Sequence, residues 1–179
     1  MKEFVGLVPP PAETKDVPRN PDWADVAKDL GTDLPVDYKS LIETYGTGAF
    51  AEFLWVLNPF TPNENLSLIS VAKRRLEGER ENRRAFPIPY PLFPEKGGLL
   101  PWAVTDNGDT LFWLTVGNPE QWHTVLNPSR SNDYHRYEVG AVGFLTGWLR
   151  DELKPMPFKG VFEPDRPAKR FDANPSYDD

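Results

Sequence analysis

The chain lacks cysteine, has only two histidines and contains no long apolar run. Without cysteine it can form neither a disulfide nor a thiolate nucleophile, and cysteine-ligated zinc and iron–sulfur sites are excluded as well. His123 and His135 are too few to build a histidine-rich catalytic or metal centre. The apolar run before Pro9 is too short for a signal peptide, and no run approaches the roughly 18 residues of a membrane span. We therefore expect a cytoplasmic protein with no membrane partner.

Basic residues are in the minority, since 20 Lys and Arg stand against 27 Asp and Glu and the net charge is −7. Nucleic-acid binding draws its free energy from basic side chains that displace counterions, so this balance argues against nucleic acid as a partner. The charge is also uneven, because residues 20–46 carry six acidic residues against two lysines, a net charge of −4. A basic partner is the natural expectation.

What the chain does contain is enough apolar and aromatic material for one domain. Its 179 residues are 13% aromatic, so a sizeable core can form without disulfides or a metal. Prolines gather near both ends, which predicts an extended N-terminal segment over residues 1–19 and an extended or disordered tail over residues 154–179. Residues 20–153 are the expected domain.

Four segments combine the helical spacing of apolar residues with suitable ends. The first has Asn20 as its N-cap and Pro21 at its first position, and it ends at Gly31. The second begins at Pro35 and ends at Gly46. The other two helices are expected over residues 63–82 and 142–153.

Five segments favour strands, namely residues 50–57, 102–105, 110–116, 121–126 and 134–138. Between two of them, Asn107 and Gly108 supply the positive φ angles that a two-residue hairpin turn needs. Residues 86–94 alternate prolines with apolar residues, which favours polyproline II and excludes a central strand. We predict an α+β fold in which an antiparallel β-meander is packed by N-terminal helices and by a closing C-terminal helix.

Two patterns suggest specific chemistry, and we assign neither of them a catalytic or metal-binding role. Residues 106–109 resemble part of a calcium loop, but the remaining ligand spacing and the closing glutamate of an EF-hand are missing, so a turn is expected. His123 is a candidate general base for a hydrolase, yet it lies on a predicted strand with no nucleophile motif nearby. We expect no catalytic residue, no metal and no cofactor, and a protein that is not an enzyme.

The candidate binding residues are mostly acidic. Asp22, Asp25 and Asp29 lie on the side of the first helix opposite its apolar stripe, and Asp33 follows that helix. This set is either a solvated face or a rigid negative surface that steers a basic partner, and both interpretations stay open.

Tryptophans complete the candidate set. Trp102, Trp113 and Trp148 have the spacing of core residues. Trp55 and Trp122 are assigned instead, with the four aspartates, to partner binding.

The order of these motifs resembles the SUKH superfamily, also called the SMI/KNR type. The resemblance spans residues 20–153. The first motif is a helix that starts at Leu34-Pro35-Val36-Asp37-Tyr38-Lys39 and ends at Tyr45-Gly46-Thr47-Gly48. The second is the Asn-Gly hairpin within residues 100–113, which is followed by the strand of Trp122. The last is the start of the final helix at Gly143-Phe144-Leu145.

This resemblance implies a binding role without chemistry. Bacterial members resemble immunity proteins of polymorphic and contact-dependent toxin systems, which implies a cognate protein toxin as partner, with a basic nuclease-like domain fitting the acidity of this chain. Fungal relatives act in cell-wall and signalling networks, so a protein-binding scaffold or regulatory adaptor is the alternative.

Overall fold

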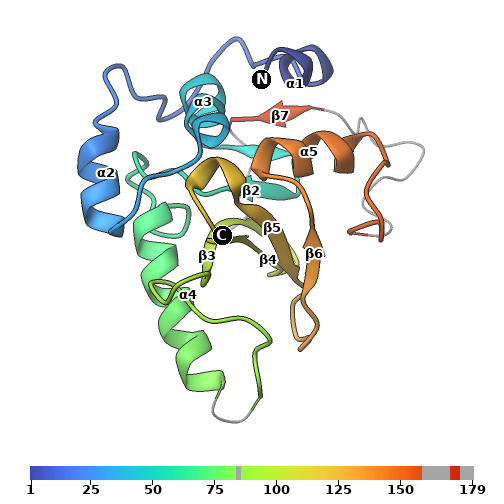
Figure 1. Cartoon of the computed structure of the whole chain (residues 1–179). Helices are drawn as coiled ribbons and strands as arrows, with labels where there is room; N and C mark the ends of the chain where they lie inside the picture. Colours follow the sequence, from blue (N-terminus) through green and yellow to red (C-terminus); the bar gives the residue numbers. More distant parts are fainter. Residues whose placement is uncertain (84–85, 159–169, 174–179) are drawn as a thin grey trace.

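The computed structural model describes residues 1–83, 86–158 and 170–173. Within these residues an antiparallel sheet carries helices on both faces (Figure 1). The helices are α1 (Lys2–Leu7), α2 (Trp23–Leu30), α3 (Val36–Tyr45), α4 (Leu68–Asn82), α5 (Ala141–Leu149) and the short 3-10 helix η1 (Pro119–Gln121). The strands are β1 (Ala49–Phe50), β2 (Leu54–Val56), β3 (Leu99–Thr105), β4 (Thr110–Leu114), β5 (His123–Asn127), β6 (His135–Tyr137) and β7 (Phe171–Asp172).

The strand order in the sheet is β6-β5-β4-β3-β2-β1-β7, and every neighbouring pair is antiparallel. From β1 to β6 the order in space follows the order in the chain, which is the predicted meander. In β4, Leu111, Phe112 and Trp113 are fully buried, as the lack of polar alternation in this strand indicates. The predicted α+β fold class is confirmed.

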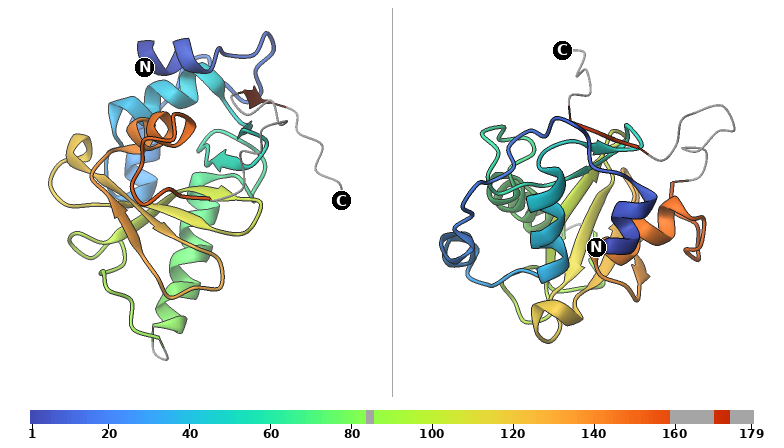
Figure 2. Two further views of the ribbon diagram at one scale, coloured as in Figure 1. Left: turned by 90° about the vertical axis from the view of Figure 1, so that its right-hand side faces the viewer. Right: turned by 90° about the horizontal axis from the view of Figure 1, so that it is seen from above.

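Helices cover the two faces of the sheet unequally (left view of Figure 2). α1, α3 and α5 pack together on one side, whereas α4 lies along the other. Under α3 and α5, Trp102 stacks on Trp113 with ring centroids 6.1 Å apart, and Tyr38 of α3 meets Trp113 edge-on at 4.9 Å. Rings of this size fill the space between the helices and the sheet and supply much of the apolar burial.

The ends of α2 and α3 follow from short-range signals in the sequence. The Asp22 carboxylate accepts a hydrogen bond from the Asp25 N–H at 3.0 Å and caps α2, and Gly31 ends this helix at φ 78°. α2 therefore begins two residues later than predicted, because Asp22 rather than Asn20 supplies the cap. α3 lies between Pro35 and Gly46, as predicted.

The N-terminal segment differs from the extended structure expected over residues 1–19. α1 is a short helix in which Phe4 is buried, and the following Val8 is buried as well. The Phe4 ring meets Tyr45 and Phe50 edge-on at 5.7 and 5.4 Å. A six-residue helix has little stability of its own, so α1 depends on this packing against the core. The local sequence does not show such packing, and the helix was therefore not predicted.

Residues 50–57 form a tight reversal and not one strand. β1 ends at Phe50 and β2 begins at Leu54, and the Phe53 N–H donates to the Phe50 carbonyl at 3.1 Å. Ala51 and Glu52 have φ angles of 54° and 53°, in the left-handed region that favours glycine. Neither residue type signals such a turn, which explains the wrong prediction.

Two further boundaries differ from the prediction. α4 begins after Ser67, whose hydroxyl accepts from the Ser70 N–H at 3.4 Å, because Asn63 closes a separate turn by accepting from the Ser67 N–H at 2.8 Å. The predicted hairpin between β3 and β4 is present, but three residues lie between Thr105 and Asp109, whose backbones are hydrogen-bonded at 3.1 Å, and Gly108 alone of the three has a positive φ. This is the arrangement of a tight turn followed by a glycine bulge.

The C-terminal tail contributes a strand where extended or disordered chain was predicted. β7 pairs with β1 through Ala49 with Asp172 and Phe50 with Phe171. The remainder of the predicted tail, residues 159–169 and 174–179, lies outside the described residues.

Candidate functional site

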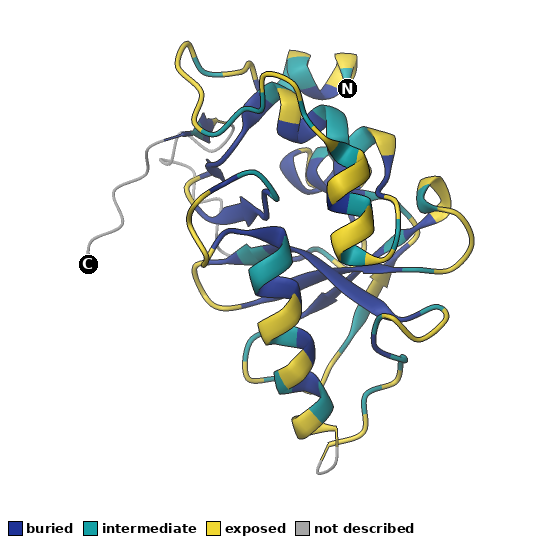
Figure 3. Ribbon diagram, turned by 90° about the vertical axis from the view of Figure 1, so that its left-hand side faces the viewer, coloured by how far each residue is buried: buried dark blue, intermediate teal, exposed yellow. Residues whose placement is uncertain are grey.

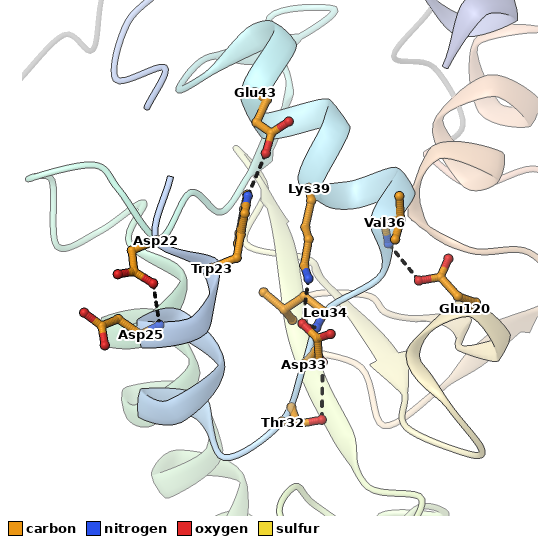
Figure 4. Close-up of polar contacts among 10 residues, drawn as sticks. All are labelled: Asp22, Trp23, Asp25, Thr32, Asp33, Leu34, Val36, Lys39, Glu43 and Glu120. Atoms are coloured by element: carbon orange, nitrogen blue, oxygen red, sulfur yellow. Dashed lines mark hydrogen bonds and ion pairs between the residues drawn. The ribbon is translucent and has the colours of Figure 1, made fainter. Parts of the chain in front are cut away.

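An acidic surface lies across α2, the loop that follows it, α3 and η1. It comprises six exposed carboxylates, on Asp22, Asp25, Asp29, Asp33, Glu43 and Glu120. Figure 3 shows the exposed side of α2, and Figure 4 shows the polar contacts that join the three elements. The four aspartates predicted from the sequence are therefore brought together on one side of the molecule.

On α2 the acidic residues share one side of the helix. Asp22, Asp25 and Asp29 follow one another at the spacing of one helix face, and Asp22 is also the cap described above. Within the described part of the chain, no ion pair involves Asp25 or Asp29. Their charge is thus open to an approaching partner.

Asp33 is partly neutralised. The Lys39 ammonium lies 2.6 Å from its carboxylate, and the Leu34 N–H donates to the same oxygen at 2.8 Å. The hydrogen bond from Lys39 holds the pKa of Asp33 below its ordinary value, and the Leu34 N–H adds to this effect. Asp33 stays ionised but offers less net charge than its neighbours on α2.

Trp23 fixes α2 against α3. Its Nε1–H donates to the Glu43 carboxylate at 2.7 Å, and the Lys39 Nζ lies 5.7 Å from the centroid of its ring (Figure 4). The ring also meets Tyr38 and Phe60 edge-on at 6.3 and 4.9 Å. One aromatic residue therefore sets the distance between the carboxylates of the two helices.

Glu120 joins the surface from a distant part of the sequence. Its carboxylate accepts a hydrogen bond from the Val36 N–H at 2.9 Å, at the N-terminus of α3 (Figure 4). Backbone N–H groups at a helix N-terminus have no partner inside the helix and attract negative charge. Glu43 is foreseeable from its spacing of four residues from Lys39, but no local signal in the sequence points to Glu120.

Beneath the exposed carboxylates, Asp37 links α3 to α5. Its carboxylate accepts from the Tyr38 N–H at 2.7 Å and from the Val142 N–H at 3.3 Å, in the first turn of α5. Burial raises the pKa of Asp37, with a further rise from the nearby Glu120 carboxylate, although both amide hydrogen bonds act in the opposite direction.

The support below this surface is rigid. Tyr38 is 0% exposed, and its hydroxyl donates to the Leu57 carbonyl. Burial raises the pKa of Tyr38 well above its ordinary value, so the hydroxyl keeps its proton for this bond. α3 thus presents its acidic residues from a fixed position on the sheet.

Trp55 and Trp122 do not lie on the acidic surface. They are 5% and 4% exposed, which leaves them little area for contact with a partner. The Trp55 Nε1–H donates to the Asp106 carboxylate at 2.7 Å, and the Trp122 ring lies 5.8 Å from Trp113. Both rings pack in the interior, where large aromatic side chains are usually found.

The patterns considered for catalysis or metal binding are engaged in other contacts. His123 Nδ1 lies 2.9 Å from the Glu138 carboxylate and 3.0 Å from the Arg136 guanidinium. Asp109 accepts from the Thr105 hydroxyl at 2.7 Å and from the Ser129 N–H at 2.8 Å. Among the described residues, no group of three or more His, Asp or Glu side chains could hold a metal ion.

The helices of the described chain are also too short or too polar to cross a membrane. This finding concerns residues 1–83, 86–158 and 170–173 only.

Comparison with known proteins identifies the family. Residues 20–145 match the SUKH_6 family model, whose description is SMI1-KNR4 cell-wall. The chain belongs to this SUKH family. The matched range runs from α2 to the middle of α5 and thus includes every element that carries the acidic surface. Searches of curated proteins and of solved structures gave no significant match.

Proposed function

We propose that this SUKH protein is an immunity protein, which binds a cognate polymorphic or contact-dependent toxin and occludes its active site or substrate path. The observation that supports the proposal is the pair of exposed carboxylates of Asp25 and Asp29, which no ion pair within the described residues neutralises. Carboxylates that form no ion pair with the described residues are available for recognition of another molecule.

The electrostatics indicate the class of toxin. Exposed charges of one sign on a fixed support accelerate association with a molecule of opposite charge, and they repel partners of the same sign. A nuclease domain carries a basic groove for its nucleic-acid substrate. The acidic surface would occupy such a groove and exclude the substrate, without a cofactor and without a chemical step.

The first test pairs this protein with toxins encoded beside its own gene. Co-expression with each toxin is scored by survival of the host cell and by co-purification of the complex. The proposal expects one toxin to be neutralised and to form a stoichiometric complex. Failure with every neighbouring toxin overturns it.

A second test locates the interface. The charge reversal Asp25→Lys with Asp29→Lys should weaken toxin binding at least about tenfold, mainly because association becomes slower. The affinity of the variant should also depend less on salt concentration. The matched control is Glu77→Lys with Glu81→Lys, two exposed acidic residues on α4, across the sheet from the acidic surface. Equal losses in both double variants would show that net charge alone matters and would reject this interface.

The description of the family model favours one alternative, a protein-binding scaffold or regulatory adaptor of the cell-wall or signalling type. This alternative predicts stable partners that are identified in strains with no toxin gene beside this one. It also predicts no survival benefit in the co-expression test, so the two functions give opposite results.

A further inference from the structure

The outer edge of β1 is filled by a segment from the end of the chain. Asp172 and Phe171 pair with Ala49 and Phe50, and the Ala51 N–H donates to the Arg170 carbonyl at 2.8 Å. β7 lies at the end of the sheet, on the outer side of β1 (right view of Figure 2). An edge strand offers a row of backbone donors and acceptors, and here residues 170–173 satisfy them.

Side chains add a recognition pattern to this pairing. Phe171 is only 7% exposed, and its ring centroid lies 5.1 Å from Tyr45 and 4.8 Å from Phe50. The Arg170 guanidinium pairs with the Glu52 carboxylate beside the turn. Ala173 is buried as well. The edge thus recognises a basic residue, an aromatic residue directly after it and a small residue two positions after the aromatic one.

Gly48 shows that the edge is shaped for an incoming strand. A Cβ atom at this position would lie 2.3 Å from the Asp172 carbonyl oxygen and 2.4 Å from the Phe171 ring. Its φ angle is outside the left-handed region, so the backbone conformation itself does not call for glycine. The glycine is needed because the backbone of β7 comes this close.

We propose that the outer edge of β1 is a strand-binding site for an extended segment of a partner protein that carries this basic residue, aromatic residue and small residue at the same spacing, and that residues 170–173 occupy the site within the chain. Strand addition to a sheet edge is a common mode of peptide recognition, in which the ladder supplies affinity and side-chain pockets supply specificity. The ladder of β7 has two residue pairs and one buried ring, so a competing strand has few contacts to replace.

β7 has an advantage over a separate partner strand, because it belongs to the same chain as the edge that it occupies. A segment linked to its site by a short connection acts at an effective concentration of about millimolar. A partner strand therefore binds the edge measurably only when it is abundant, when it is itself held nearby by other contacts, or when the internal segment is weakened. This inference is independent of toxin binding, because the edge of β1 carries none of the residues of the acidic surface.

The experiment uses the full chain and a fluorescent capped peptide, Gly-Gly-Arg-Phe-Asp-Ala-Gly-Gly. The Phe171→Ala variant weakens the internal segment and should bind this peptide at least about tenfold more tightly than the wild type does. A peptide with alanine in place of phenylalanine should bind the same variant at least about tenfold more weakly. Equal binding of both peptides, or of the peptide to both chains, overturns the proposal.

Gly48→Ala provides the matched control, because it blocks the close approach of any strand to this edge. Added to Phe171→Ala it should abolish peptide binding, and alone it should increase trypsin cleavage after Arg170 at least about fivefold in the otherwise native chain. Unchanged cleavage contradicts the assignment of the edge. A concentration-dependent dimer of the wild type that Phe171→Ala dissolves would identify a second copy as the occupant, and would overturn the choice of a different partner.

Discussion

The acidic surface and the outer edge of β1 are built in opposite ways. The acidic surface consists of charged side chains that stand in solvent above a rigid aromatic support. The edge of β1 consists of backbone groups and one aromatic socket, and it is already filled. Charges act over about 8 Å at physiological ionic strength, whereas strand pairing acts only on contact. The first region suits rapid recognition of a class of partner, and the second suits selection of one sequence in one register.

This contrast also separates binding from stability. Asp25 and Asp29 stand in solvent and form no ion pair within the described residues, so substitutions of these two aspartates should change binding much more than the free energy of unfolding. Residues that hold the segment 170–173 against β1 make contacts within the chain, so substitutions there should lower the local stability of this segment and its protection against proteolysis. Three pairs of substitutions test this separation, beginning with the largest expected effect.

Phe50→Ala against Phe171→Ala compares the two sides of the β1 edge. Phe50 is 1% exposed in the core, and its truncation should lower the free energy of unfolding by about 3–5 kcal/mol. Phe171→Ala should cost only about 1–2 kcal/mol, because the loss is limited to the free energy that docks a two-residue ladder. Urea denaturation measures both values. Equal costs would show that β7 is an integral part of the core and would remove the contrast.

Tyr38→Phe probes the support of the acidic surface. Loss of the hydroxyl leaves the buried Leu57 carbonyl without its donor, and we expect a cost of about 1–3 kcal/mol by urea denaturation. Tyr137→Phe is the control, since the hydroxyl of Tyr137 donates to the carbonyl of the exposed Pro155, where water can take its place. If both changes cost the same, the support is no more rigid than the surface of the molecule.

Asp37→Asn tests the charge buried beneath the acidic surface. Because burial raises the pKa of this carboxyl, the folded chain binds its proton more tightly than the unfolded chain. Relative to the variant, the wild type should lose stability as the pH rises from the ordinary pKa of 3.8 to the raised value. The slope should not exceed about 1.4 kcal/mol per pH unit. Parallel stability curves for the two proteins would contradict the raised pKa.

Asp33→Asn is the matched control and the smallest expected effect. The pKa of Asp33 is lowered, so its contribution to stability is present above the ordinary pKa and is lost as the pH falls through the lowered value. The sign is opposite to that of Asp37. Because Asp33 is exposed, the difference should stay below about 0.5 kcal/mol.

Short-range signals in the sequence account for much of the fold. Pro35 and Gly46 bound α3, Gly31 ends α2, and Asn107-Gly108 marks the β3–β4 hairpin, because caps and turns depend on residues within one turn of one another. The hydrophobic run in β4 likewise indicated its central place. Where two capping residues compete, as Asn20 and Asp22 do, the pattern alone did not choose the right one.

The candidate site was only half foreseeable. The aspartates of α2 and Asp33 lie in one short stretch, so their clustering follows from the helix period. Trp55 of β2 and Trp122, between η1 and β5, lie in the interior, and their place was not foreseeable because contacts with residues far away in the sequence decide whether such a ring faces the core or solvent. Glu120 reaches the surface only because the loop after β4 lies against the N-terminus of α3.

Composition, helix period and turn chemistry are thus enough to predict an acidic α+β protein, because they depend on residue content and on neighbouring residues, and the family follows from the match to the SUKH family model. The packing of α1, the reversal at Ala51 and Glu52, and the pairing of β7 with β1 came only with the folded chain. Each of these features is held by contacts between residues far apart in the sequence. Their free energy exists only after the chain has closed those distances.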